Sequence, residues 1–154
     1  MPALEKKSAF IPVATAKPTG LNDLGIPASD DLAVKKGKLA EFAQPIEGGK
    51  VGRMFQNLRA VLVKTVEGGQ PSGKLVLMFE IFGDDNAPVG VNSGIDLALY
   101  AGDTLLAELK HGPVFLPYAC AWYENRVAFD ITLDAFEKAD KLEFIALADD
   151  VRVL

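Results

Sequence analysis

Histidine and cysteine are almost absent from this chain of 154 residues, since His111 and Cys120 are the single copies of each. A single cysteine excludes an internal disulfide. Zinc sites and Ser–His or Cys–His nucleophile systems normally need histidine beside partner side chains, so both are disfavoured. We expect His111 to be a solvated turn residue between strands. Cys120 lies in the apolar stretch PYACAWY, and we expect it to be a small buried side chain.

Positive charge is also scarce. The chain has 16 Lys and Arg against 21 Asp and Glu, which gives a formal net charge of −5, and the acidic excess lies after residue 50. Phosphate backbones and anionic membrane surfaces repel an acidic domain of this kind. The composition therefore predicts neither direct nucleic-acid binding nor membrane binding.

Long hydrophobic runs are missing as well, so no segment reaches the length of a membrane span. Lys6 and Lys7 precede the short apolar stretch SAFIPVATA, which faintly imitates a secretion signal. Pro12 interrupts that stretch, and we expect no cleaved signal peptide. The predicted location is the cytoplasm or a virion.

Catalytic and cofactor motifs are absent too, and the sequence predicts neither an enzyme nor a cofactor. The best ligand candidate is the loop GDDNAPVGVNSGID at 83–96. Its oxygen-bearing side chains are of the type that calcium prefers: Asp84, Asp85, Asn86, Asn92 and Asp96. The EF-hand spacing fails because Pro88 stands at the fifth position and no bidentate Glu follows. A polar turn between strands is the competing interpretation, and no metal is assigned.

Alternating apolar residues dominate the chain from residue 51 onward. The stretches GIDLALYA (94–101) and RVAFDITL (126–133) have the period of two that is typical of strands, and KLVLMFEIF (74–82) is rich in β-branched and large apolar residues. The gaps between the strands are the size of turns. We expect RAVLVKTV (59–66) and KLVLMFEIF to form a hairpin through the loop EGGQPSG, and we expect a turn at Glu124 and Asn125. Both faces of the strand at 74–82 are expected to be covered, because both are apolar. We therefore predict an all-β fold for 51–154, an antiparallel β-sandwich of immunoglobulin-like or jelly-roll type with one or two short helical turns.

Residues 1–50 differ from the predicted sandwich at 51–154, because prolines and glycines interrupt every regular pattern of apolar residues. We predict an extended N-terminal arm, with one short helical segment near 30–43 that Ser29 would cap. Apolar side chains recur along the arm as candidate anchors to a partner: Phe10, Ile11, Val13, Leu21, Leu24 and Ile26.

Aromatic residues gather in VFLPYACAWY, which we expect to form a strand over 114–123. Strand alternation would put Tyr118, Cys120 and Trp122 on one face. Core packing is the favoured role for that face, and a stacking platform for sugars or bases is the alternative.

Together these features favour a non-enzymatic structural protein. In general architecture the chain is similar to the arm-bearing β-sandwich proteins that build or decorate phage heads and tails. That similarity implies a homo-oligomeric subunit of a symmetric virion, either a capsid decoration or a head–tail component, whose arm binds neighbouring subunits. The alternative is a ligand-binding sandwich for carbohydrate or calcium, with the 83–96 loop and Trp122 or Tyr123 as its site.

Overall fold

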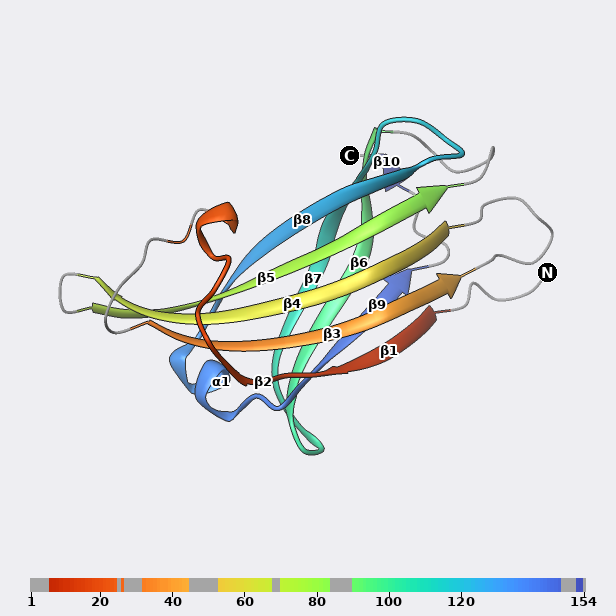
Figure 1. Cartoon of the computed structure of the whole chain (residues 1–154). Coiled ribbons are helices and arrows are strands. Elements are labelled where there is room, and N and C mark those ends of the chain that lie inside the picture. The colour runs from red at the N-terminus through yellow and green to blue at the C-terminus, as the bar shows by residue number, and fades with distance from the viewer. Residues whose placement is uncertain are drawn as a thin grey trace.

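The described residues form two antiparallel sheets of five strands each, packed face to face (Figure 1). The computed structural model describes residues 6–24, 26, 32–44, 53–67, 70–83, 90–147 and 152–153. The elements, in chain order, are β1 (Lys6–Pro12), β2 (Ala14–Ala16), the short 3-10 helix η1 (Asn22–Leu24), β3 (Ala33–Gln44), β4 (Arg53–Glu67), β5 (Gln70–Gly83), β6 (Gly90–Ala101), β7 (Thr104–Leu116), β8 (Trp122–Ile131), α1 (Leu133–Lys138), β9 (Lys141–Leu147) and β10 (Arg152–Val153). The predicted antiparallel β-sandwich is confirmed.

In Figure 1, strands β6 and β7 of one sheet run steeply across strands β3, β4, β5 and β8 of the other. The front sheet has the strand order β2-β3-β4-β5-β8. The back sheet has the order β1-β9-β6-β10, and β7 pairs with β6 as well. The predicted hairpin is present, because β4 and β5 pair antiparallel with Val61 opposite Val76.

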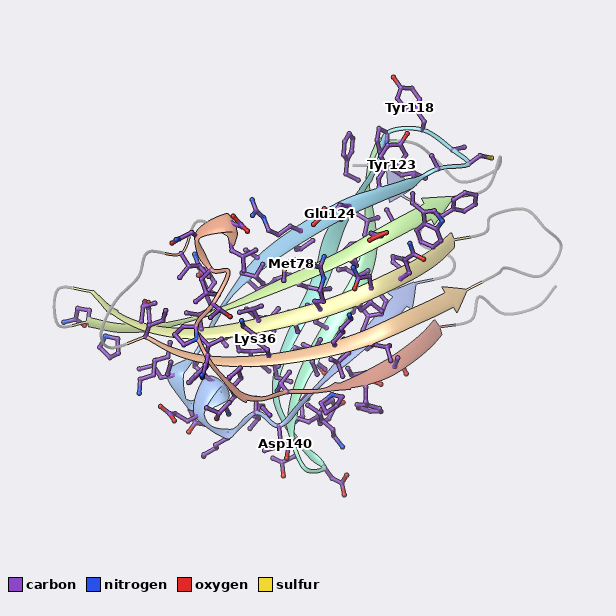
Figure 2. The ribbon with its side chains drawn as sticks, viewed as in Figure 1. Lys36, Met78, Tyr118, Tyr123, Glu124 and Asp140 are labelled. Carbon is purple, nitrogen blue, oxygen red and sulfur yellow. The ribbon has the colours of Figure 1, made fainter. Side chains whose placement is uncertain are left out.

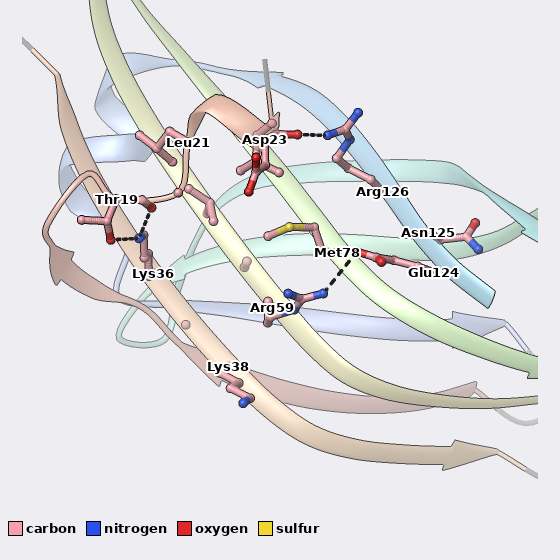
Figure 3. Close-up of a pocket in the computed structure, with 15 residues that line it drawn as sticks. Thr19, Leu21, Asp23, Lys36, Lys38, Arg59, Met78, Glu124, Asn125 and Arg126 are labelled. Carbon is pink, nitrogen blue, oxygen red and sulfur yellow. Dashed lines mark hydrogen bonds and ion pairs between the residues drawn. The ribbon is translucent and has the colours of Figure 1, made fainter. Parts of the chain in front are cut away.

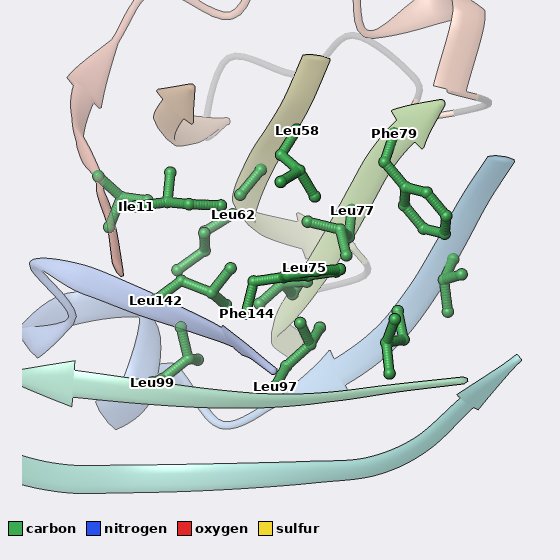
Figure 4. Packing of buried hydrophobic residues seen from close by; sticks show 14 of the residues in the cluster. Ile11, Leu58, Leu62, Leu75, Leu77, Phe79, Leu97, Leu99, Leu142 and Phe144 are labelled. Atoms are coloured by element: carbon green, nitrogen blue, oxygen red, sulfur yellow. The ribbon is translucent and has the colours of Figure 1, made fainter. Parts of the chain in front are cut away.

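Apolar side chains from the inner faces of both sheets form the main core (Figure 4). From β5, alternate residues point inward and are buried, as the period of two predicts: Leu75, Leu77, Phe79 and Ile81. Phe144 of β9 meets Phe55 of β4 at a ring-centroid distance of 5.2 Å, in an edge-to-face arrangement. Each fully buried side chain of this size contributes about 2 kcal/mol of transfer free energy.

The N-terminal segment connects the two sheets. Strand β1 pairs with β9 at the edge of the back sheet, and β2 pairs with β3 at the edge of the front sheet. Between these strands the chain crosses the side of the sandwich, where Val13 N donates to the Asp140 carbonyl at 2.9 Å. Ile11 and Val13 are both buried in the main core. We call residues 6–16 the strap.

The strap passes very close to Gly37 of β3 where it crosses from one sheet to the other. A Cβ atom at this position would lie against the carbonyl oxygen of Pro12, with methyl groups of Ile11 and Val13 both 2.9 Å away. Distances under 3 Å leave no room for a carbon atom beside a backbone oxygen. Glycine is therefore required here by space, since its neighbours are backbone and buried side chains.

A second apolar cluster lies on the outer face of the front sheet. Residues 19–24, which include η1 and which we call the η1 segment, lie over this face, and Ile26 packs there too. Leu21 and Ile26 are buried there, and Leu24 packs partly against them. The sheet contributes Val34, Val61, Val63 and Val76. The outer side of β5 at Val76 is thus covered, as its apolar sequence predicts.

The helix predicted near 30–43 is wrong. Residues 33–44 form strand β3, which pairs with β2 on one side and β4 on the other. Val34 enters the outer apolar cluster and Leu39 packs against the main core, so pairing and burial override a weak helical pattern. Ser29, the expected cap, lies outside the described residues. The sandwich therefore takes three strands from the first fifty residues, which we predicted to be an arm.

Strand boundaries also differ around β7 and β8. The predicted strand over 114–123 ends at Leu116, and His111 lies within β7 instead of in a turn. Residues 124 and 125, which we expected to form a turn, belong to β8 and pair with β5.

Helix α1 closes one end of the core. The side chain of Thr132 caps it by accepting from Ala135 N at 3.1 Å, and Phe136 is buried. Lys35 Nζ donates to the carbonyls of Glu137 and Ala139 at 2.9 and 2.8 Å, which satisfies the C-terminal end of the helix. Burial lowers the pKa of Lys35, and the charge of Glu137 acts in the opposite direction.

Glu137 joins α1 to the front sheet through Lys64, whose Nζ lies 2.7 Å from the carboxylate. The hydrogen bond from Lys64, and then its charge, lower the pKa of Glu137. A carboxyl group whose pKa is lower in the folded than in the unfolded state stabilises the folded protein at pH values above its unfolded-state pKa. This stabilisation is lost as the pH falls through the folded-state pKa. Glu137→Gln should therefore lower the urea midpoint slightly at neutral pH and leave it unchanged in acid.

Glu108→Gln is the matched control, because Glu108 pairs with Lys110 of the same strand at 3.6 Å and both side chains are exposed. Its effect on the urea midpoint should be smaller than that of Glu137→Gln. A loss for Glu137→Gln that stays the same from neutral to acid pH would contradict the assignment.

Candidate functional site

Large apolar side chains are exposed at the end of the sandwich where β7 connects to β8. Phe115 is 50% exposed, Tyr118 70% and Trp122 39%. We call these three residues the aromatic rim. Figure 2 shows Tyr118 projecting away from the ribbon at this connection. Large apolar side chains that are exposed on neighbouring strand ends are candidates for an interaction surface.

The rim is exposed because strand pairing stops at Leu116. Pro117 has no backbone donor, and Cys120 adopts a left-handed φ of 63°. Cys120 N donates to the Gly83 carbonyl at 2.6 Å, which attaches the connection to the end of β5. The side chains of Tyr118, Cys120 and Trp122 are all exposed. The prediction that they pack in the core is therefore wrong.

Trp122 is held in place although part of its ring is open to solvent. It lies opposite Phe82 in the register of β5 and β8, and the two ring centroids are 5.5 Å apart. The next residue, Tyr123, is half-buried and packs against the main core. The indole ring thus offers a fixed apolar surface at the start of β8.

Asn125 fastens the two strand ends that carry the rim. Phe115 N donates to Asn125 Oδ1 at 2.7 Å, and Asn125 Nδ2 donates to the Phe115 carbonyl at 2.8 Å. One buried carboxamide, 8% exposed, thereby bonds both backbone groups of a residue in the other sheet. The sequence pattern predicted a turn at Asn125 and did not indicate this role.

The predicted arm anchors lie mainly inside their own domain. Four are buried, in the main core or in the outer apolar cluster: Ile11, Val13, Leu21 and Ile26. Leu24 packs partly against the outer cluster. Phe10 alone of the six is largely exposed, and its ring lies 5.9 Å from that of Tyr100 and 4.9 Å from Lys141 Nζ.

The candidate calcium loop falls largely beyond the described residues, which exclude Asp84, Asp85 and Asn86. Asn92 has its backbone in β6, opposite Val153 of β10. Asp96 is half-buried in β6, opposite Ile145 of β9. Within the part of the chain that is described, no group of three or more His, Cys, Asp or Glu residues could hold a metal ion.

In the described ranges, no helix is long and apolar enough to cross a membrane. No protein-family model and no curated protein matches the sequence. A proposal of function therefore rests on the surface of the chain itself.

Proposed function

We propose that the protein is a non-enzymatic structural subunit of a large symmetric assembly and that it contacts neighbouring copies through the aromatic rim. The observation that carries this proposal is the exposure of Phe115, Tyr118 and Trp122 at one end of the sandwich. Tyrosine and tryptophan are the side chains that most often dominate the binding energy of protein interfaces. The rim therefore has the composition of a contact site.

The rim is also prepared for binding. Asn125 holds its strand ends together, and Phe82 supports Trp122. A surface that is fixed before binding loses little conformational entropy on association. This favours a specific protein contact over a mobile apolar loop.

The kind of assembly is proposed from architecture. A small acidic β-sandwich with an N-terminal strap is similar in general form to proteins that build or decorate phage particles, and we propose that the chain belongs to such a virion. Four of the six predicted arm anchors are buried within the chain and Leu24 is partly buried, so the rim, with exposed Phe10 as a second candidate, is the surface proposed to meet neighbours.

The native mass tests this proposal. Mass photometry of the wild-type protein should show an oligomer, and the double variant Tyr118→Ser/Trp122→Ser should shift it to the monomer. Because both side chains are exposed, the thermal midpoint should change little. Leu105→Ser is the control for loss of an exposed large apolar residue elsewhere. A wild-type monomer, or a double variant of unchanged mass, would contradict the role of the rim.

Carbohydrate binding is the second candidate, and the fixed, half-exposed ring of Trp122 favours it. Sugars stack on such rings. Trp122 is the sole tryptophan of the chain, so its fluorescence reports on this position alone. Titration with soluble oligosaccharides should quench or shift that emission if the ring is a sugar platform. Unchanged emission throughout would remove this candidate.

A further inference from the structure

A groove of about 840 Å³ lies between the η1 segment and the outer face of the front sheet (Figure 3). Residues 19–24 form one wall, and strands β3, β4, β5 and β8 supply the floor and the far side. Its volume is in the range of small-molecule sites. It is separate from the aromatic rim, none of whose three residues lines it.

The wall of the groove is fixed from the sheet by two basic side chains. Arg126 Nη1 donates to the Asp23 carbonyl at 2.7 Å. Lys36 Nζ donates to the Thr19 carbonyl at 2.8 Å and lies 3.3 Å from its hydroxyl. Because Leu21 is buried beneath this segment, the groove exists before any ligand binds.

Basic residues outnumber acidic residues along the groove, although the whole chain has a net charge of −5. The basic lining residues are Lys36, Lys38, Arg59 and Arg126, and the acidic ones are Asp23 and Glu124. Lys38 lies directly opposite Arg59 in the register of β3 and β4. Like charges in that arrangement repel each other, which costs stability unless an anion lies between them.

The neighbours of these side chains leave much of the positive charge uncompensated. The acceptors of Lys36 and Arg126 named above are carbonyl and hydroxyl groups, which have no net charge. Arg59 is 3.6 Å from Glu124, whose side chain is 71% exposed. Lys38 has no ion-pair partner among the described residues.

The floor of the groove is apolar. Val61 is buried and Met78 is half-buried on it, and Met78 lies between Arg59 and Arg126 in the register of the sheet. We propose that the groove binds a small organic anion with an apolar body. Its acid group lies between Lys38 and Arg59, and its body covers Val61 and Met78.

Binding of anilinonaphthalene sulfonate, an apolar anion whose fluorescence rises on leaving water, tests the proposal. The wild-type protein should bind this dye, and binding should weaken as salt is added. N-phenylnaphthylamine, which lacks the sulfonate, should bind more weakly. Equal binding of the neutral compound, or no binding of the dye, would overturn the proposal.

Charge removal locates the site. Lys38→Gln/Arg59→Gln should raise the dissociation constant about tenfold, while Lys38→Gln alone, at an exposed position that cannot endanger the fold, should raise it about threefold. Lys110→Gln/Lys138→Gln removes the same charge from β7 and α1 and should leave the constant unchanged. Equal weakening by both double variants would overturn the assignment.

Two further measurements distinguish the groove from the rim, and a small anion from an acidic peptide. The rim variant Tyr118→Ser/Trp122→Ser should bind the dye as the wild type does, so the outcome is independent of the proposed assembly contact. Loss of binding in that variant would place the dye on the rim and overturn the proposal. If the wild-type protein bound a hexaglutamate peptide but not the dye, the proposal would also be overturned. The groove would then be assigned to an acidic protein segment.

Discussion

Replacing Gly37 with alanine is expected to lower the free energy of unfolding by about 3 kcal/mol, at the upper end of the usual cost of overpacking. The added Cβ would collide with the Pro12 carbonyl and crowd Ile11 and Val13. These neighbours cannot rotate away, because one is backbone and the others are buried in the core. The strap would have to move off β3, and the burial of two core side chains would be lost with it.

Urea unfolding and hydrogen exchange measure this effect. The amide of Val13, which donates to Asp140, should exchange much faster in Gly37→Ala. Gly102→Ala is the control, since Gly102 has a φ of +58° and a Cβ added there would have no neighbouring atom within 4 Å. Its cost should be about 1 kcal/mol, from conformation alone. A Gly37→Ala protein as stable as the wild type would show that the strap does not pack as described.

Asn125→Leu is expected to lower the free energy of unfolding by about 3 kcal/mol, because it leaves two backbone groups of Phe115 without their bonds. The loss should appear in both urea and thermal unfolding. Glu124→Gln, a change at the exposed neighbouring residue, should have little effect. Equal midpoints for Asn125→Leu and the wild type would contradict the bridging role.

Asn125→Asp separates the hydrogen bonds from packing. The ionised carboxylate can accept from Phe115 N but faces the Phe115 carbonyl without a proton to donate. Protonation restores the donor, so the folded state favours the neutral acid and its pKa is raised. Stability of this variant relative to the wild type should therefore rise as pH falls through that pKa. Asn125→Leu should show no such recovery.

Much of the sandwich could be predicted from period-two patterns. The stretches 74–82, 94–101 and 126–133 lie within β5, β6 and β8, or nearly so. The stretches 94–101 and 126–133 alternate because one face of each packs on the main core, whereas 74–82 is apolar on both sides because Val76 lies in the outer cluster. Such patterns arise from the local sequence and from the burial of one face of a strand. Strands that have them can therefore be predicted from the sequence alone.

The candidate sites could not be predicted in the same way. Strand β3 has a weak pattern, since its Val34 faces an outer cluster that residues 21–26 supply. Asn125 bonds to a residue of the other sheet, and no local signal reveals such a partner. Pro117 did carry information, because a proline that interrupts an aromatic run indicates the end of a strand. That signal would have predicted the exposed rim.

The strap also bears on the order in which the molecule folds. Strand β1 is among the first residues of the chain, yet its partner β9 follows eight other elements and α1 in the sequence. The hairpin β4–β5 can form from neighbouring residues alone. Closing the edge of the back sheet, in contrast, joins segments with a large loop-entropy cost. The last event of folding is therefore expected to be the one that seals Ile11 and Val13 into a core already assembled by the rest of the chain.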